Sequence, residues 1–246
     1  MNVVYGSPSF TSEVMGTGYC PGCGHGTVHK LLAEVVEELS VREKTVLCYP
    51  IGCAGLGGGW TNLNTLSCAH GRAGAVATAV KKTNQDNVII AYQGDGDLAA
   101  IGMAETMHAA NRGENITVIF INNTNFGMTG GQMAPTTLIG QKATTSPDGR
   151  DLERHGAPFK MAELIAKLEA PKFVGRYAVH DAKNAIKTKA AIKKGLQMQL
   201  DKKGYSFIEV LSVCPTNWKK NPLDSAKYID EVVSKTYPLG VYKDVE

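Results

Sequence analysis

Two apolar, β-branched segments of this chain each end abruptly in a short polar sequence. Residues 87–93 (NVIIAYQ) run into Gly94-Asp95-Gly96-Asp97, and residues 115–122 (NITVIFIN) run into Asn123. Continuous apolar runs of this length are typical of strands buried on both faces of a parallel sheet. A helix expected over residues 98–111 separates them, so both polar endings should lie at the carboxyl edge of one sheet.

The same alternation of strands and helices continues through the chain. Further strands are expected over residues 45–49, 172–179 and 205–213, and further helices over residues 27–39, 71–82 and 182–202. We therefore predict an α/β fold, with a mostly parallel sheet covered by helices on both faces. One domain is expected over residues 1–246, with a cysteine-rich N-terminal loop and a C-terminal tail. The long Gly-, Thr- and Pro-rich segment 127–158 is expected to be a functional loop.

The composition excludes several classes of function. The net charge is only +3, from 26 Lys and Arg against 23 Asp and Glu, which gives no electrostatic case for a nucleic-acid or membrane partner. The N-terminal sequence lacks a basic region followed by an apolar stretch, and no apolar run approaches the ~20 residues that span a bilayer. A cytoplasmic protein is therefore expected.

Asp95 and Asn123 predict a metal site that holds a diphosphate. The glycines around Asp95 let backbone N–H groups approach phosphate oxygens, and the following helix N-terminus favours negative charge. Asp95 alone would repel a diphosphate, whereas a Mg²⁺ ion between them accepts one or two protein oxygens together with phosphate oxygens. A turn-forming aspartate and an ordinary asparagine at a strand end are the simpler alternative, but the two-strand arrangement favours the metal site.

Four of the six cysteines form a second pattern. Cys20 and Cys23 lie in YCPGCGHG, Cys53 in PIGCAG and Cys214 in SVCPTNW. In a cytoplasmic protein such cysteines indicate ligation rather than disulfides. A CxxC pair with two distant cysteines suits either zinc or a [4Fe–4S] cluster, although zinc ribbons typically use two CxxC pairs. Cys48 lies in a strand pattern and is expected to be a small buried residue, and the role of Cys68 stays open.

Together the motifs CPGCGHG, IGC, HGRA, GDGDLAAIG, NNxxFGMTGGQ and CPTNW resemble the β subunit of 2-oxoacid:ferredoxin oxidoreductases, over about residues 19–218. The resemblance implies thiamine diphosphate, Mg²⁺ and one [4Fe–4S] cluster as cofactors. It implies that Asp95, the Asn123 side chain and the Asn125 carbonyl bind Mg²⁺, and that Cys20, Cys23, Cys53 and Cys214 bind the cluster. The positions that it implies for the rest of the cofactor site are Ile51, Gly52, Cys53, Ala54, His70, Gly71, Arg72, Gly94, Gly96, Asp97, Phe126, Gly127, Met128 and Thr129.

The family commonly has Tyr where this chain has Phe126, so any hydroxyl contact at that position is lost. The resemblance implies oxidative decarboxylation of a 2-oxo acid with CoA, giving acyl-CoA and CO₂. The glutamate that contacts the aminopyrimidine ring is expected from an α subunit, which carries the pyrimidine-binding half and the CoA site. A γ subunit, a ferredoxin-like δ subunit and ferredoxin are the further expected partners. Glu105 is expected on a packed helix instead, so no catalytic base is assigned to this chain.

The apolar sequence Ala54-Gly55-Leu56-Gly57 after the third cysteine favours a branched-chain or aryl 2-oxo acid. Family members that act on small or acidic 2-oxo acids often have Lys or Arg shortly after this cysteine, and 2-oxoglutarate and pyruvate remain the alternatives. Two other classes share part of the pattern. A non-oxidative thiamine diphosphate decarboxylase or synthase needs no cysteine set, and a zinc-ribbon module leaves Asp95 and Asn123 unexplained.

Overall fold

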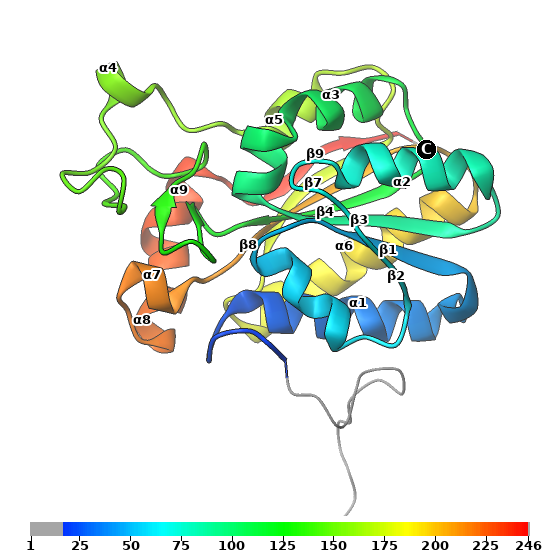
Figure 1. Cartoon of the computed structure of the whole chain (residues 1–246), viewed down its shortest axis with the longest axis horizontal. Helices are drawn as coiled ribbons and strands as arrows, with labels where there is room; N and C mark the ends of the chain where they lie inside the picture. The colour runs from blue at the N-terminus through cyan, green and yellow to red at the C-terminus, as the bar shows by residue number, and fades with distance from the viewer. Residues whose placement is uncertain (1–16, 246) are drawn as a thin grey trace, which may run out of the picture.

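A computed structural model describes residues 17–245 of the chain (Figure 1). The N-terminal sequence considered above for a leader segment, and residue 246 of the expected domain, lie outside the described residues. The strands are β1 (Thr45–Tyr49), β2 (Asn64–Ser67), β3 (Val88–Gly94), β4 (Thr117–Asn122), β5 (Asn125–Phe126), β6 (Gln132–Met133), β7 (Phe173–Ala178), β8 (Ser206–Leu211) and β9 (Gly240–Asp244).

Helices connect most of these strands. The α-helices are α1 (Gly24–Glu38), α2 (Ala73–Thr83), α3 (Met103–Asn111), α4 (Leu152–His155), α5 (Met161–Ala166), α6 (Ala182–Leu200), α7 (Pro215–Trp218), α8 (Pro222–Tyr228) and α9 (Ser234–Thr236). The 3₁₀ turns are η1 (Arg42–Lys44) and η2 (Cys53–Gly59), and the π-helical turns are η3 (Asp97–Ile101) and η4 (Ile229–Val233).

Seven strands form one sheet in the order β2-β1-β3-β4-β8-β7-β9. All neighbouring pairs are parallel except β7 and β9. The predicted mostly parallel sheet is therefore confirmed. In the parallel pair β3–β4, Gly94 lies opposite Ile121, which brings the polar sequences after both strands to the same edge.

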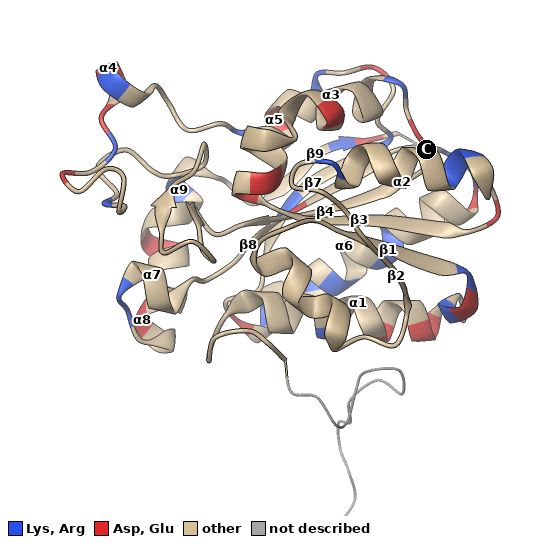
Figure 2. Ribbon diagram, viewed as in Figure 1, with Lys and Arg blue, Asp and Glu red and all other residues tan. Residues whose placement is uncertain are grey.

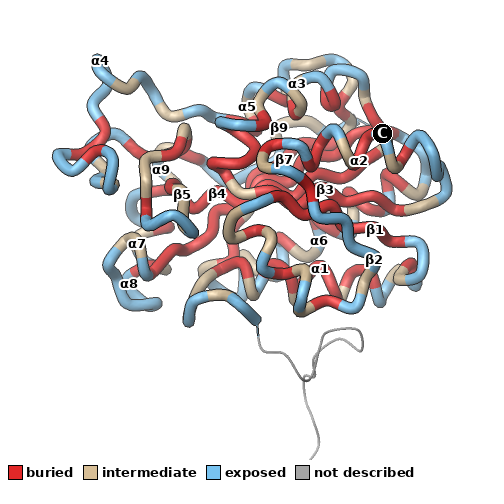
Figure 3. The backbone as a smooth tube through the Cα atoms, viewed as in Figure 1, coloured by how far each residue is buried: buried red, intermediate tan, exposed pale blue. Residues whose placement is uncertain are grey.

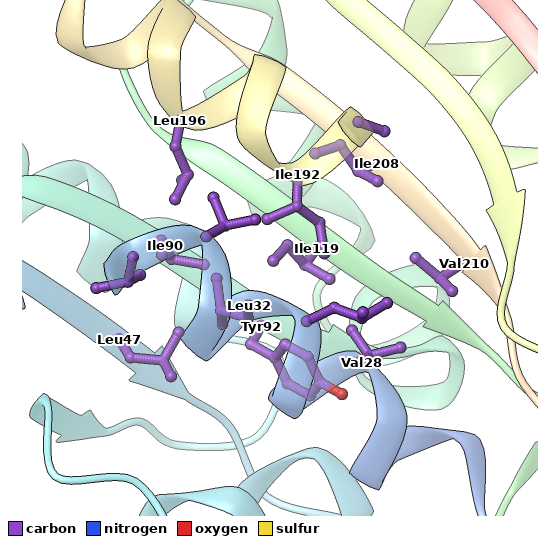
Figure 4. Packing of buried hydrophobic residues seen from close by; sticks show 14 of the residues in the cluster. Val28, Leu32, Leu47, Ile90, Tyr92, Ile119, Ile192, Leu196, Ile208 and Val210 are labelled. Carbon is purple, nitrogen blue, oxygen red and sulfur yellow. The ribbon is translucent and has the colours of Figure 1, made fainter. Parts of the chain in front are cut away.

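Alternate residues of the buried strands pack against different helices. On one face Ile90, Ile119 and Ile208 pack with residues of α1 and α6, as Figure 4 shows. On the other face Ile89 and Phe120 pack with residues of α2, α3 and α5. Strand positions are buried on both faces (Figure 3), which explains why the strands read as continuous apolar runs. Each fully buried aliphatic side chain contributes roughly 1.5–3 kcal/mol, so these two layers form the core that fixes the carboxyl edge.

The helix expected over residues 98–111 is divided by Gly102. The π-helical turn η3 precedes this glycine and α3 follows it. A Cβ atom at Gly102 would collide with the carbonyl oxygen of Gly71, so this break brings the backbone of η3 against the loop before α2. That contact positions the residues near His70, and glycine alone fits there.

Two edge strands and a group of helices were not predicted. β2 is exposed at all four positions, so it has no buried apolar pattern that would identify it. The segment expected to be a C-terminal tail instead contains α7, α8, η4 and α9, and β9 adds an antiparallel strand to the sheet edge. Within residues 17–245, no helix combines the length and the apolar character that crossing a bilayer requires.

Candidate cofactor site

A cavity opens at the carboxyl edge of β1, β3 and β4. All the residues expected to line the cofactor are at this cavity except Gly71 and Arg72. Its lining is Ile51, Gly52, Cys53, Ala54, His70, Gly94, Asp95, Gly96, Asp97, Asn123, Asn125, Phe126, Gly127, Met128 and Thr129, together with His25. Asp95 follows β3 and Asn123 follows β4, as the register of the parallel pair requires.

Asp95 is buried without a cationic partner among the described residues that contact it. Its Oδ1 accepts a hydrogen bond from the Gly96 N–H at 2.8 Å, and its Oδ2 accepts one from the Thr136 hydroxyl at 2.6 Å. Desolvation raises the pKa of this carboxyl to about 7 despite those hydrogen bonds. A buried carboxylate of this kind is stabilised by a cation at the same site. The surroundings of the Asp95 carboxylate are therefore those expected for a ligand of Mg²⁺.

Space for a ligand exists beside the same carboxylate. A Cβ atom built at Gly94 or at Gly52 would meet nothing within 4 Å, so both backbones border open space. At Gly96 a Cβ atom would instead collide with the Phe126 ring. The glycines thus let the backbone approach a ligand on one side and the Phe126 ring on the other.

The second aspartate of the motif is bound within the protein. Asp97 accepts hydrogen bonds from the Gly71 N–H and from Gln93 Nε2, the latter at 2.6 Å, and it pairs with His70 Nδ1. Burial raises the pKa of Asp97, while these partners oppose the rise. Asp97 thus positions His70 and the backbone at Gly71. Gln93, which also holds Asp97, is a residue that the motifs did not identify.

Arg72 lies away from the cavity, although the family resemblance assigned it to the cofactor site. Its guanidinium forms an ion pair with Glu105 at 2.9 Å and donates to the Ile101 carbonyl at 3.4 Å. Glu105 on α3 therefore pairs with Arg72, and it is not among the residues that line the cavity. Gly71 contributes its N–H to Asp97 instead of lining the cavity.

A strained turn carries the two asparagines expected to bind Mg²⁺. Thr124 lies between them with φ of 62°, a conformation that is costly for a β-branched residue. The Asn122 side chain holds this turn, because its Oδ1 accepts from the Thr124 N–H at 3.2 Å. Thr137 donates to the Thr124 carbonyl at 2.6 Å, and Gln141 donates to the Thr124 hydroxyl at 2.7 Å.

Asn122 is in turn held by a buried charge network. Its Nδ2 donates to Glu209 Oε1 at 2.8 Å, and Glu209 Oε2 pairs with Arg176 Nε at 2.9 Å. Neither charged side chain is exposed, and Arg176 also binds Glu163. The network runs across β4, β8 and β7 to the turn at Asn123. Sequence reasoning could not find it, since its members come from separate strands.

The four predicted cluster ligands come together beside this cavity. Cys20 and Cys23 precede α1, Cys53 begins η2, and Cys214 precedes α7. The pKa of Cys23 is raised to about 12 and that of Cys53 to about 11. Burial is the largest cause, and electrostatic repulsion from the neighbouring cysteines adds to it. Thiols that affect one another in this way suit a shared metal centre, because metal binding deprotonates them.

The cysteine group and the cavity share a wall. Cys214 Sγ lies 3.7 Å from Asn125 Oδ1, and the Asn217 side chain contacts Asn125, Gly127 and Cys214. Cys53 lines the cavity itself, and a Cβ atom at Gly127 would lie 3.1 Å from its sulfur. A group bound in the cavity and a group bound by the four cysteines would thus be separated by little more than these side chains.

The remaining cysteines lie apart from this group. Cys48 is fully buried in β1, as expected, and packs in the core on the face of the sheet that α2, α3 and α5 cover. Cys68 follows β2 and is 4 % exposed. A hydrogen bond between the two thiols raises the pKa of Cys48 and lowers that of Cys68.

A buried aromatic cluster, formed by Tyr19, His25, His29, Tyr49 and Tyr92, supports the loops that carry Cys20, Cys23 and Cys53. His25 Nδ1 is 2.8 Å from the Tyr92 hydroxyl, and the His29 ring lies tilted against the Tyr92 ring at a centroid distance of 4.2 Å. Neither ring nitrogen of His29 has a hydrogen-bond partner. Burial lowers the pKa of both histidines to about 3, so both are neutral at pH 7.

Comparison with known proteins assigns the chain to a class. Residues 50–210 match the thiamine pyrophosphate enzyme C-terminal TPP binding domain. This chain is therefore a thiamine-diphosphate enzyme domain of the C-terminal type.

The relatives narrow the class to a family. The chain is 46% identical over 233 residues to ketoisovalerate oxidoreductase subunit VorA of Methanothermobacter thermautotrophicus, covering 95% of this chain and 49% of VorA. It is 39% identical over 219 residues to 2-oxoglutarate synthase subunit KorB of Methanocaldococcus jannaschii, covering 87% of this chain and 77% of KorB. The chain belongs to the β-type subunits of the 2-oxoacid:ferredoxin oxidoreductases. It spans about half the length of the VorA relatives.

A solved structure has the same fold. 2-Oxoglutarate:ferredoxin oxidoreductase from Magnetococcus marinus superposes with a TM-score of 0.80 at 23% sequence identity, covering 96% of this chain and 84% of that chain. Its reported ligands are 2-oxoglutarate, coenzyme A and succinyl-CoA. At this identity the similarity establishes the fold.

Proposed function

We propose that this chain binds the diphosphate end of thiamine diphosphate in an enzyme that oxidatively decarboxylates a 2-oxo acid with CoA. The electrons leave through a [4Fe–4S] cluster on the same chain. The observation that carries the proposal is the shared wall, where Cys53 lines the cofactor cavity and Cys214 contacts Asn125 at 3.7 Å. A cluster held there would lie close enough to the cofactor for direct electron transfer.

The residues around Asp95 fit a Mg²⁺–diphosphate group. Asp95, the Asn123 side chain and the Asn125 carbonyl would hold the ion, and the backbone at Gly94 would border the phosphates. Thiamine diphosphate, when bound, supplies the electron sink that allows a 2-oxo acid to lose CO₂. The protein's own part is to exclude water from a buried carboxylate, to fix the turn through Asn122, and to orient His70 through Asp97.

The donor set of the cysteine group fits an iron–sulfur cluster. Four thiols from three loops would bind it, and the backbone N–H of His25 donates a hydrogen bond to Cys23 Sγ. Hydrogen bonds to cysteine sulfur tune the reduction potential of such clusters. These groups would therefore set how readily the cluster accepts electrons.

The cavity holds only part of an active site. Among the described residues that line it the carboxylates are Asp95 and Asp97, and glutamate is absent from that lining. We expect the catalytic glutamate from the pyrimidine-binding half on an α subunit, with γ, δ and ferredoxin as further partners. The chain alone should accordingly show no turnover. Oxidation of a 2-oxo acid by the purified chain without partners would contradict this expectation.

The proposed substrate has an apolar side chain, branched or aryl. Ala54 is buried beside Cys53, Ile51 and Met128 present apolar side chains to the cavity, and the VorA relative is named for ketoisovalerate. The KorB relatives are named for 2-oxoglutarate, which keeps that acid and pyruvate as alternatives. The test compares kcat/KM for 2-oxoisovalerate, phenylglyoxylate, 2-oxoglutarate and pyruvate in the full complex. A preference for either of the last two would overturn the assignment.

Cofactor analysis of the anaerobically purified complex separates the rival functions. We expect thiamine diphosphate, magnesium, iron and acid-labile sulfide, with a visible chromophore that oxygen bleaches. Thiamine diphosphate without iron would indicate a non-oxidative decarboxylase or synthase instead. Zinc in place of iron, without thiamine diphosphate, would indicate a zinc-binding module.

A further inference from the structure

A histidine and two aspartates meet where the C-terminal helices approach the sheet. His180 and Asp181 follow β7, and Asp230 lies on the π-helical turn η4. His180 Nε2 is 3.0 Å from Asp181 Oδ2 and 2.9 Å from Asp230 Oδ1, and the three ligand atoms lie within 4.8 Å of one another. Figure 2 shows acidic colour on the helical segment next to α9, which contains η4. These side chains do not line the cofactor cavity, and none of the functions assigned above uses them.

The His180 ring is buried, although both carboxylates reach the surface. Its side chain is 2% exposed, against 42% for Asp181 and 66% for Asp230. Among the described residues, Nδ1 has no hydrogen-bond partner, and the partners of Nε2 are the two carboxylates and, at 3.5 Å, the Asn184 amide. An almost fully buried side chain thus directs one nitrogen between two carboxylates and has no other firm polar contact.

The protons of a single imidazole do not suit this arrangement. A neutral ring carries at most one proton at Nε2, and that N–H can be directed at only one of the two carboxylates. A protonated ring would balance the charges, but the Nδ1–H of a charged group would then be buried without an acceptor. A divalent cation among the three atoms accepts the Nε2 lone pair and attracts both carboxylates at once.

The position of Asp181 is fixed by α6, which it caps. Its Oδ1 accepts from the Asn184 N–H at 2.7 Å, and its Oδ2 accepts from Asn184 Nδ2 at 2.6 Å. Ligand atoms of a tetrahedral zinc ion lie about 3.3–3.6 Å apart when its bonds are about 2.0–2.2 Å long. The observed separations therefore require only a small outward shift of the exposed carboxylates. One imidazole with two carboxylates favours a first-row ion such as Zn²⁺ over Mg²⁺ or Ca²⁺, which prefer oxygen ligands.

We propose that His180, Asp181 and Asp230 bind a Zn²⁺ ion that joins the end of β7 to the C-terminal helices. Water completes the coordination, because both carboxylates are exposed on their outer side. The site is separate from the four cysteines and from Asp95, so it does not depend on the proposed reaction.

An ion at this position would hold η4 against the sheet. Ile229 of η4 packs in one apolar cluster with Ala178 of β7. Tyr228, which precedes η4, packs edge to face on Trp218 with ring centroids 5.1 Å apart, and Trp218 Nε1 donates to the Asn123 carbonyl at 3.1 Å. The zinc ion would therefore stabilise the helices that support the turn at Asn123.

The test measures zinc binding to the assembled anaerobic complex by equilibrium dialysis and metal analysis. Asp230→Asn and His180→Gln are the variants, and Glu231→Gln, at the neighbouring exposed position of η4, is the matched control. We expect the unmodified complex and the control to bind one more Zn²⁺ per copy of this chain than His180→Gln does. Asp230→Asn should raise the Kd of that ion at least tenfold, because an anionic ligand is lost. Zinc taken up elsewhere in the complex is common to all four preparations and cancels in the comparison.

Hydrogen exchange provides a second readout that does not rely on counting ions. Zinc should slow amide exchange over residues 222–237 in the unmodified complex and leave it unchanged in Asp230→Asn, whose altered side chain is exposed. Equal zinc content and equal Kd in the unmodified complex and in Asp230→Asn would overturn the inference. Exchange over residues 222–237 that does not respond to zinc in the unmodified complex would overturn it as well, and would leave the three side chains as an ion-pair group.

Discussion

At the scale of single residues, the chemistry of the cofactor site depends on a carboxylate that is unfavourable for the fold in the absence of a cation. Asp95 is buried, the hydrogen bonds that it accepts come from neutral donors, and its pKa is raised to about 7. A folded-state pKa above the unfolded value means that the charged form destabilises the fold as pH rises from about 4 to 7. A cation is expected to offset this cost.

Asp95→Asn should therefore separate stability from function. We expect the magnesium-free chain at pH 8 to become more stable by up to roughly 4 kcal/mol, the equivalent of the pKa rise. Magnesium-dependent binding of thiamine diphosphate should weaken at least a hundredfold, because the anionic ligand is lost. Urea unfolding and cofactor titration measure the two effects. A destabilised variant that binds the cofactor normally would contradict the assignment of Asp95.

Asn122 provides a second prediction at this scale, since it connects Glu209 to the strained turn at Thr124. In Asn122→Ala we expect the magnesium concentration that half-saturates cofactor binding to rise about tenfold, the equivalent of ~1.4 kcal/mol lost from the turn. Asn111→Ala, on the exposed end of α3, is the matched control. The role of Asn122 would be refuted if both variants required the same magnesium concentration.

At the scale of elements, glycines determine where backbone meets backbone and where it meets a ligand. Gly102 packs against the Gly71 carbonyl, whereas Gly94 borders open space at the end of β3. These two positions lie on adjacent parts of one strand–turn–helix unit. Replacement by alanine at each position therefore tests two different properties: packing at Gly102 and ligand binding at Gly94.

Gly102→Ala should destabilise the fold by roughly 1–3 kcal/mol, because the added methyl group forces η3 away from the loop at Gly71. Gly94→Ala should leave the melting temperature within about 2 °C and still weaken cofactor binding at least tenfold, because its methyl group enters the open space. Thermal unfolding and cofactor titration of both variants distinguish these effects. Normal cofactor binding by Gly94→Ala would show that the ligand lies elsewhere.

The sequence predicted the buried elements better than the exposed ones. The strand expected over residues 45–49 is β1 without change, because every position is apolar or buried. β2 and β9 escaped detection, since these edge strands have no fully buried position and carry no continuous apolar run. The cavity lining followed from motifs local in sequence, but Thr136 and Asn217 reach the site through contacts between distant segments. Such contacts depend on packing that no local pattern encodes.

At the scale of the whole molecule, buried neutral histidines link the stability of the fold to pH. His29 lies in the aromatic cluster without hydrogen-bond partners, and burial lowers its pKa from 6.5 to about 3. Because the unfolded chain binds more protons between these values, stability should fall as pH decreases below 6.5. The slope from one such histidine is about 1.4 kcal/mol per pH unit.

His29→Leu should reduce this acid sensitivity by about that slope. The measurement is urea unfolding at pH 7.5, 6 and 5, with His108→Leu, at an exposed position of α3, as the comparison variant. We expect the two variants to differ more at pH 5 than at pH 7.5. Parallel loss of stability with acid in both variants would show that His29 does not carry the effect.

The central claim is that the cofactor cavity and the cysteine group act as one redox unit. The most direct test adds 2-oxoisovalerate and CoA to the anaerobic complex and follows the electron paramagnetic resonance of the reduced cluster. We predict that the signal appears in the unmodified complex and is lost in Asp95→Asn, although the iron content of that variant is unchanged. A cluster that is reduced equally fast in Asp95→Asn, or a complex without iron, would contradict the account.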